Sequence, residues 1–355
     1  MLVLPLLAAS CNRPEPEPEP EPQPEAYAKG MYVLNEGLFQ LNNSTLSYYD
    51  FTTGQLTEDI FLNVNHRGLG DVGNDLQRYG SKLYCVVNNS NIVEVMDFRT
   101  AQSLKTINLS GKQPRRLAFL DGKAYISCFD GDVVRVDTAS LEIEATVHAG
   151  RNPDGICVCN GKLYVCNSGG LDYPNYGNTV SVIDPVSFTV TKDITVVLNP
   201  TRVKAYNDRY VYVVSNGNYG DVSYAFQKID CQTDEIVKTY DLEVYNFEIY
   251  QNLAYVYSYN FSTMTSWIKV LDLETDEVVN DSFISDGTQL QTPYNITVNP
   301  LNGDVYITDA GTSYTANGDV YCFDKDGKKK FSFEAGLCPA SMVFDFGEQD
   351  LTAKR

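Results

Sequence analysis

The residues that most often carry catalysis or bind metals are few in this chain, and their spacing suits neither task. There are two histidines, His66 and His148, and neither has a partner at a metal-ligand spacing. Cys157 and Cys159 form a Cys-x-Cys pair, whereas zinc and redox sites use Cys-x-x-Cys. No Gly-x-Ser-x-Gly nucleophile elbow occurs. We therefore expect no catalytic group and no metal site. We expect His66 to be an exposed loop residue and His148 to lie on an outer strand.

The chemistry that the sequence favours is binding through aromatic rings and amides. Five polar segments are rich in Tyr, Asn, Ser and Gly, and they cover residues 36–44, 167–178, 215–224, 258–267 and 309–318. Their candidate contact residues are Tyr173, Tyr176, Tyr219, Tyr259, Phe261 and Tyr314. Tyrosine offers a flat apolar face with a polar edge, and Asn, Ser and Gly offer adaptable hydrogen bonding, as in antibody loops. The plainer alternative is that these tyrosines pack the loops onto the fold.

A second candidate set is polar and recurs with an internal repeat of the chain. Aligning the repeats places five residues at one equivalent position, and they are Asn74, Arg116, Arg202, Asn246 and Asn295. Tyr245 and Tyr294 precede the last two, and Arg115 and Arg151 lie close by in sequence. A ring of such groups could hydrogen-bond a polar ligand. The alternative is that they only hydrate a channel mouth and pair with nearby Asp.

The repeat itself predicts the elements that position these residues. One pattern recurs seven times. It consists of a strand with Tyr-Val-x-Asn or a close variant, a loop, a second strand that ends in Asp, and a third strand. The tyrosine anchors are Tyr32, Tyr84, Tyr125, Tyr164, Tyr212, Tyr255 and Tyr306. The aspartate anchors are Asp50, Asp97, Asp137, Asp184, Asp230, Asp272 and Asp324. Prolines open five of the apolar strands that precede the tyrosines, and they are Pro114, Pro153, Pro200, Pro293 and Pro339.

Each repeat therefore holds four strands in about 40–50 residues, which is typical of propeller blades. The sequence shows no stretch with helical periodicity. We predict an all-β protein, a seven-bladed β-propeller of four-stranded antiparallel blades over residues 30–347. The last strand, Ser341–Phe346, should pair beside the first, Met31–Asn35, and close the ring. The long polar segments should share one face, because they join strand two to three or strand four to the next blade.

The N-terminal residues indicate export and anchoring. Residues 1–10 resemble a signal peptide, too short to span a bilayer, and Ala8-Ala9-Ser10-Cys11 resembles a lipobox that would be lipidated at Cys11. Residues 11–29 include an acidic, proline-rich run that favours an extended tether. Residues 348–355 are interpreted as a C-terminal tail. We expect the remaining cysteines to be small buried residues with free thiols, although an export compartment permits disulfides.

The charge excludes some partners. The chain has 46 acidic residues against 27 Lys and Arg, a formal charge of −19. Such a surface repels phosphate backbones and anionic lipid, so we expect no nucleic acid partner and membrane contact only through the N-terminal lipid.

The Tyr-Val-x-Asn strands, as Tyr32-Val33-Leu34-Asn35 and Tyr164-Val165-Cys166-Asn167, resemble the YVTN repeats of YncE-like and surface-layer propellers. Together with the lipobox and the acidic tether, they resemble the surface-exposed cobalamin-binding propeller lipoproteins of the BtuG type in Gram-negative bacteria. That resemblance implies a surface-exposed outer-membrane lipoprotein. It implies a corrinoid, cobalamin, as bound ligand and a TonB-dependent outer-membrane transporter as partner.

Three functions are compatible with the sequence. The first is non-enzymatic capture of a corrinoid on the face with the long loops. The second is a glycan-binding or adhesive propeller of the surface-layer type, because tyrosines also stack on sugar rings. The third is a propeller hydrolase or lyase, which the scarcity of histidines disfavours.

Overall fold

A computed structural model of the protein describes residues 27–347. The predicted signal peptide, Cys11, most of the tether and the C-terminal tail lie outside the described residues. Within residues 27–347, we find no helix with the length and apolar character needed to cross a bilayer.

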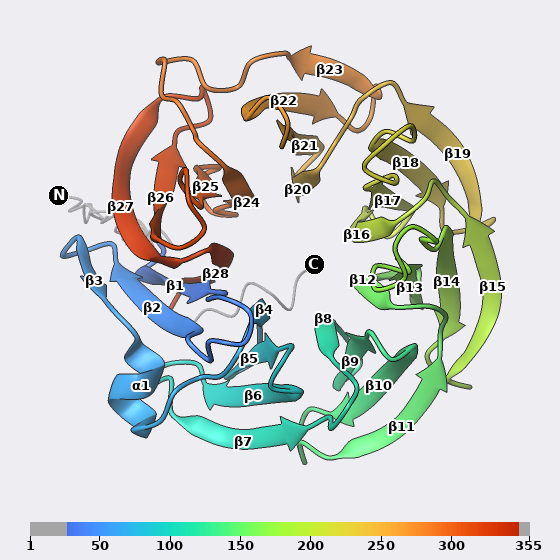
Figure 1. The fold of residues 1–355 in the computed structure, drawn as a ribbon, viewed down its shortest axis with the longest axis horizontal. Helices are drawn as coiled ribbons and strands as arrows, with labels where there is room; N and C mark the ends of the chain where they lie inside the picture. Colours follow the sequence, from blue (N-terminus) through green and yellow to red (C-terminus); the bar gives the residue numbers. More distant parts are fainter. Residues whose placement is uncertain (1–26, 348–355) are drawn as a thin grey trace, which may run out of the picture.

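Seven four-stranded antiparallel sheets are arranged around a central axis, which we call the channel (Figure 1). In every blade the first strand named lies at the channel and the last at the outer rim. Blade 1 holds β28 (Pro339–Asp345), β1 (Gly30–Asn35), β2 (Thr45–Asp50) and β3 (Gln55–Thr57). Blade 2 holds β4 (Gly73–Tyr79), β5 (Lys82–Val87), β6 (Ile92–Asp97) and β7 (Ser103–Asn108). Blade 3 holds β8 (Pro114–Leu120), β9 (Lys123–Cys128), β10 (Asp132–Asp137) and β11 (Ile143–His148). Blade 4 holds β12 (Pro153–Cys159), β13 (Lys162–Asn167), β14 (Thr179–Asp184) and β15 (Thr189–Thr195).

The other three blades repeat the pattern. Blade 5 holds β16 (Pro200–Tyr206), β17 (Tyr210–Ser215), β18 (Ala225–Asp230) and β19 (Glu235–Tyr240). Blade 6 holds β20 (Asn246–Tyr250), β21 (Leu253–Asn260), β22 (Thr265–Asp272) and β23 (Glu277–Asn280). Blade 7 holds β24 (Pro293–Val298), β25 (Val305–Asp309), β26 (Asn317–Phe323) and β27 (Lys329–Leu337). The predicted fold class and blade count are confirmed.

The ring closes between the two strands that the repeat phase predicted. β28 pairs antiparallel with β1, with Gly30 opposite Asp345 and Tyr32 opposite Val343. The five predicted prolines are the first residues of β8, β12, β16, β24 and β28, where a missing N–H costs no ladder bond. Six aspartate anchors end the third strands of their blades, and Asp324 directly follows β26. Their carboxylates accept main-chain N–H groups of the next turn, as Asp137 does from Ala139 and Ser140.

The apolar core is a ring of blade interfaces. Each of seven buried clusters combines residues of two neighbouring blades, for example Tyr84 of blade 2 with Leu117 of blade 3. Because every sheet is covered on both faces, its strands are apolar at successive positions. The stack of blades fixes where each inner strand begins, and therefore where the candidate residues lie.

One helix departs from the predicted all-strand chain. α1 (Ile60–Asn65) lies at the outer rim between β3 and β4 (Figure 1). The Asp59 carboxylate accepts the N–H of Leu62 at its start, and Phe61 is fully buried. Six residues are too few for a helical period to show in the sequence.

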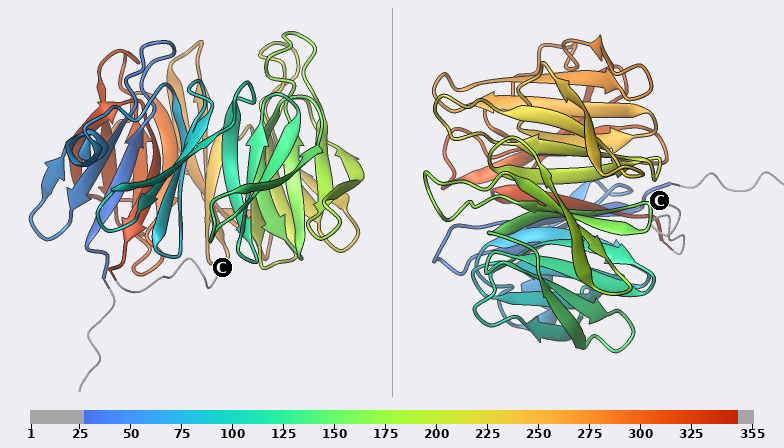
Figure 2. Two further views of the ribbon diagram at one scale, coloured as in Figure 1. Left: turned by 90° about the horizontal axis from the view of Figure 1, so that it is seen from below. Right: turned by 90° about the vertical axis from the view of Figure 1, so that its right-hand side faces the viewer.

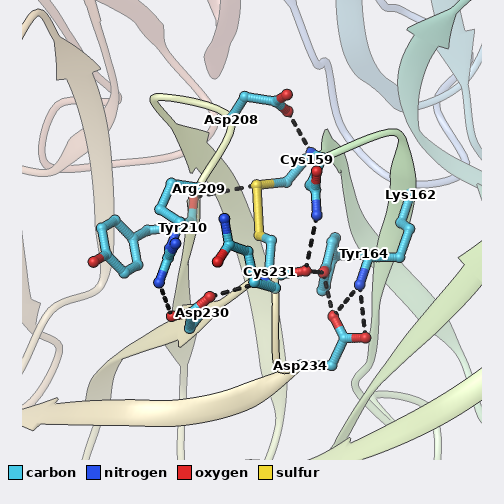
Figure 3. Close-up of a disulfide and its surroundings, with 11 residues drawn as sticks. Cys159, Lys162, Tyr164, Asp208, Arg209, Tyr210, Asp230, Cys231 and Asp234 are labelled. Carbon is cyan, nitrogen blue, oxygen red and sulfur yellow. Dashed lines mark hydrogen bonds and ion pairs between the residues drawn. A yellow bond between two sulfur atoms is a disulfide. The ribbon is translucent and has the colours of Figure 1, made fainter.

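A disulfide joins Cys159 at the end of β12 to Cys231 after β18, which corrects the prediction of free thiols for this pair (Figure 3). The bond links blades 4 and 5 on the face with the short turns. Beside it, the Lys162 ammonium lies 2.6 Å from the Asp234 carboxylate and links the same two blades. The other described cysteines are free, as predicted.

We predict that Cys231→Ala lowers the free energy of unfolding by about 2–4 kcal/mol, because the lost bond closes a loop of 72 residues. Urea unfolding of the two proteins measures the difference. Reducing agent should lower the melting temperature of the wild type and leave that of the variant unchanged. A wild type that is indifferent to reducing agent contradicts the prediction.

Candidate ligand-binding face

The loops that join strand two to strand three, and strand four to the next blade, share one side of the disc, which we call the long-loop face (Figure 2). Five aromatic side chains of these loops are exposed to solvent, and they are Phe39, Tyr173, Tyr219, Phe261 and Tyr314. The predicted grouping of the polar loops on one face is therefore confirmed. The segment 258–267 is less of a loop than predicted, since β21 and β22 extend until only residues 261–264 remain between them.

Several of these rings touch in edge-on pairs. Tyr176 lies between Tyr173 and Tyr219, with centroid distances of 6.1 and 6.0 Å, and so joins the loops of blades 4 and 5. Tyr294 contacts Tyr314 at 6.3 Å on blade 7. Edge-on packing leaves one face of an outer ring, such as Tyr173 at 75% exposure, open to a ligand.

Tyr259 does not lie at the surface as the loop assignment implied. It is 1% exposed, its hydroxyl lies 3.3 Å from the Thr292 hydroxyl, and its ring supports Phe261. Burial leaves it no surface for a ligand, so its part is to hold Phe261 outward.

The strand register corrects one residue of the predicted ring. Four predicted residues do occupy equivalent positions on the inner strands, and they are Arg116, Arg202, Asn246 and Asn295. Each lies two residues before the residue that pairs with the anchor tyrosine of the next strand. In blade 2 that position is held by Asp75, opposite Val86, and not by Asn74. The ring therefore contains a carboxylate where an amide was expected.

Asn74 sits instead at a β-bulge that recurs at the start of the inner strands. The register shifts there in β4, β8, β12, β16 and β24. A bulge bends the strand and redirects a side chain. The residue after the opening position of the inner strand is Asn74, Arg115, Asp154, Thr201 and Tyr294 in these five blades.

Two predicted asparagines link neighbouring inner strands. The Asn246 amide donates to the Asn295 side-chain oxygen at 3.1 Å, and the Asn295 amide donates to the Ala340 main-chain oxygen at 2.7 Å. The Tyr294 hydroxyl donates to the Glu36 carboxylate at 2.5 Å. These groups hold blades 6, 7 and 1 together at the channel, and a ligand contact by any of them stays a prediction.

Three arginines converge on one carboxylate in the blades opposite. Asp154 is almost wholly buried, and its two oxygens accept from Arg115 at 3.3 and 3.2 Å. Arg116 Nε lies 3.8 Å from the same carboxylate, and its Nη1 donates to the Asn74 main-chain oxygen at 2.5 Å. Arg202 belongs to the same electrostatic cluster, since it lowers the pKa of Asp154.

The pKa shifts follow from this crowding. Burial alone raises the pKa of Asp154, but the three arginines outweigh it and hold that pKa below its usual value. Burial, with the Arg202 charge next in size, lowers the pKa of Arg116 to about 10. Burial raises the pKa of the Tyr245 hydroxyl to about 12, although Arg202 nearby opposes the shift. All these groups keep their usual charge at neutral pH.

The cluster opens into a hollow of about 220 Å³ on the long-loop face between blades 3 and 6. The second residue of the inner strand lines it in blades 3, 4 and 5, and these residues are Arg115, Asp154 and Thr201. Tyr245 takes the corresponding place in blade 6. Arg202 joins them, and loop residues, including Phe129, Tyr176 and Tyr219, form the upper wall. The structure thus brings Tyr176, Tyr219, Tyr245 and Arg202 together, as predicted for one binding face.

Sequence reasoning missed Asp154, Phe129 and Thr201. The signal for Asp154 and Thr201 was present, because each follows a strand-opening proline as Arg115 follows Pro114. Phe129 stacks on the Arg115 guanidinium, whose carbon lies 4.3 Å from the ring centroid. No spacing in the sequence indicates that contact.

The remaining candidates lie apart from the hollow. His66 ends α1 at the rim and is exposed, and His148 is the last residue of the outermost strand β11. Arg151 lies in a loop, where it pairs with Asp172 at 2.7 Å. Within residues 27–347, no three His, Cys, Asp or Glu side chains form a metal-binding group.

The fold defines this protein as a seven-bladed β-propeller with a polar hollow at one end of its channel. The sequence model of a family described as "Domain of unknown function (DUF5074)" matches residues 29–345, and the chain belongs to that family. No curated protein matches the chain.

Three solved structures show the same fold at low sequence identity. A protein from Lactobacillus plantarum is 15% identical, with a TM-score of 0.62 over 90% of this chain and 99% of that one. Hydrazine synthase of Kuenenia stuttgartiensis is 16% identical, with a TM-score of 0.59 over 72% and 77%. The computationally designed Ika8 protein is 14% identical, with a TM-score of 0.58 over 90% and 92%.

Proposed function

We propose that this propeller is a non-enzymatic binding protein that captures a corrinoid, with cobalamin as the candidate, on its long-loop face. One observation carries the proposal. The long-loop face combines exposed aromatic rings with a polar hollow lined by Arg115 and Arg202, in a chain whose formal charge is −19. A corrinoid is a wide flat ring with amides around its rim, so it needs apolar surface and many hydrogen-bonding partners at once.

The dimensions of the hollow indicate how such a ligand would lie. About 220 Å³ is below the usual volume of a site that encloses a drug-sized ligand. A corrinoid would therefore lie across the face, with its ring against Tyr173, Tyr219 and Phe261, and only one substituent would enter the hollow.

The proposal includes the cellular setting implied by the resemblance. The protein would be an outer-membrane lipoprotein, anchored through Cys11 and exposed at the surface, that passes its ligand to a TonB-dependent transporter. The disulfide between Cys159 and Cys231 supports export, because such bonds persist in oxidising compartments.

A glycan is the second candidate ligand. Tyr173 and Tyr219 are 75% and 59% exposed, and tyrosine faces stack on sugar rings as well as on corrins. A neutral glycan would use these rings and would offer Arg202 no anionic group.

We predict that the purified protein binds cyanocobalamin with submicromolar affinity, and that Tyr219→Ala weakens binding about tenfold, because about 1.4 kcal/mol of ring contact is lost. Isothermal titration calorimetry measures both. Val186→Ala is the control, since Val186 is exposed on the turn after β14, on the opposite face. Absence of heat with cyanocobalamin and with cobinamide would rule out the corrinoid.

A further inference from the structure

We propose that the hollow between blades 3 and 6 is an oxyanion site, and that it takes a phosphodiester group of the captured ligand through Arg202. The inference rests on the proposed function insofar as the long-loop face binds the ligand. It adds a chemical class: the ligand carries a phosphate ester on a flexible arm.

The charges in and behind the hollow do not cancel. Three guanidinium groups, those of Arg115, Arg116 and Arg202, accompany two carboxylates, those of Asp75 and Asp154. The surplus positive charge lies inside a strongly acidic protein. Solvent screens charges less in a recess than at an open surface, so the surplus acts more strongly on a ligand there.

Both carboxylates already have donors. Asp154 accepts two hydrogen bonds from Arg115. Asp75 accepts from the Gln77 amide at 2.9 Å and from the main-chain N–H of Leu117 at 2.9 Å, and its nearest arginine nitrogen lies 3.9 Å away. Neither carboxylate therefore takes up the donors of Arg202.

Arg202 is the guanidinium left for a ligand. Among the described residues, its side chain donates one hydrogen bond, from Nη1 to the Thr201 main-chain oxygen at 3.3 Å, and has no carboxylate oxygen within 4.0 Å. A guanidinium has five N–H donors in a planar fork. Its Nε and Nη2 atoms have no protein partner and are not enclosed. Because Arg202 lines the hollow, these donors are available to a ligand there.

The fork geometry favours a phosphate group over a neutral one. Two parallel N–H groups of an arginine match two oxygens of a phosphate, and such charged pairs are stronger than neutral hydrogen bonds. Asp154 lies beside Arg202 and would repel an anion, but Arg115 and Arg116 both approach that carboxylate and offset its charge. A phosphodiester, with a single negative charge, matches the single surplus positive charge.

The test compares two corrinoids by calorimetry. Cyanocobalamin carries a phosphodiester, and dicyanocobinamide lacks it. Arg202→Gln should weaken the binding of cyanocobalamin at least about tenfold and the binding of dicyanocobinamide less than about threefold. Arg202→Lys keeps the charge but not the planar fork of donors. Its affinity for cyanocobalamin should lie between those of the wild type and Arg202→Gln. Arg209→Gln removes a charge paired with Asp230 on the short-turn face, and it should leave both affinities unchanged.

Inorganic phosphate separates this inference from the proposed function. Wild-type protein should melt at a higher temperature in phosphate than in chloride of equal ionic strength, and Arg202→Gln should not. If Arg202→Gln affects both corrinoids equally, or neither, the oxyanion site is refuted and corrinoid capture stands. If phosphate stabilises only the wild type while neither corrinoid binds, the site stands and the corrinoid is wrong. No response to phosphate or to either corrinoid overturns both.

Discussion

A chain that ends at Cys338 is expected not to form the closed ring, because it lacks β28, the innermost strand of blade 1. Met342, Phe344 and Phe346 are buried between blades 7 and 1. Burial of three such side chains contributes about 5–9 kcal/mol, which is comparable with the whole stability of many domains. The truncation also leaves the inner edge of β1 unpaired, and free edges promote aggregation.

Thermal unfolding followed by circular dichroism, together with size-exclusion chromatography, measures this effect. The truncated chain should show no cooperative transition and should elute as large aggregates. A chain ending at Gly347 is the matched control, since it keeps β28 and Phe346 and should melt within a few degrees of the full protein. Equal melting temperatures for the two truncations would show that β28 does not close the ring.

Asp154→Asn is expected to lower the free energy of unfolding by about 3–5 kcal/mol, since it leaves three guanidinium groups around a neutral amide. Shape is nearly preserved, so the loss reports on charge. The same variant should bind phosphate more tightly than the wild type, because it removes the anion beside Arg202. Asp281→Asn is the control, since Asp281 is exposed and paired only with Lys269, and it should change stability by less than about 1 kcal/mol.

The pH dependence of stability gives a second measurement for the same carboxyl. The folded pKa of Asp154 lies below its unfolded value, so its contribution is complete above the unfolded pKa and is lost as pH falls through the folded pKa. Urea unfolding at about pH 7 and about pH 3 should therefore differ more for the wild type than for Asp154→Asn. Equal differences would mean that the arginines do not favour the ionised form.

The fold was predictable because its determinants are local and repeated. An anchor tyrosine, an aspartate that accepts turn N–H groups and a strand-opening proline each act within one blade, and the period exposes them. Closure of the ring followed from where the repeat starts and stops. Met31 lies in the second strand of a blade that has no first strand before it, and Ser341 lies in a first strand that no further strands follow.

The site was predictable where it follows the repeat, as at Arg202, or where the loop composition marks it, as at Tyr176 and Tyr219. Asn74 was misplaced by one residue because blade 2 opens with Gly73, where five other blades have a proline that marks the start of the inner strand. Tyr259 was misplaced because β21 continues past its usual length and carries that ring into the blade. The partner of Cys159 lies in another repeat, at Cys231, and no period relates the two.

The antiparallel pairing of β1 with β28 also fixes how the disc is mounted. Gly30 faces Asp345 across that pair, so the folded part begins and ends at the same point on the short-turn face (Figure 2). An anchor attached before residue 27, as proposed, would therefore join the disc on its short-turn face, opposite the hollow. Collection from the surroundings is unobstructed in this posture. Under the proposed anchoring, a ligand bound at the hollow would lie on the side of the disc away from the membrane.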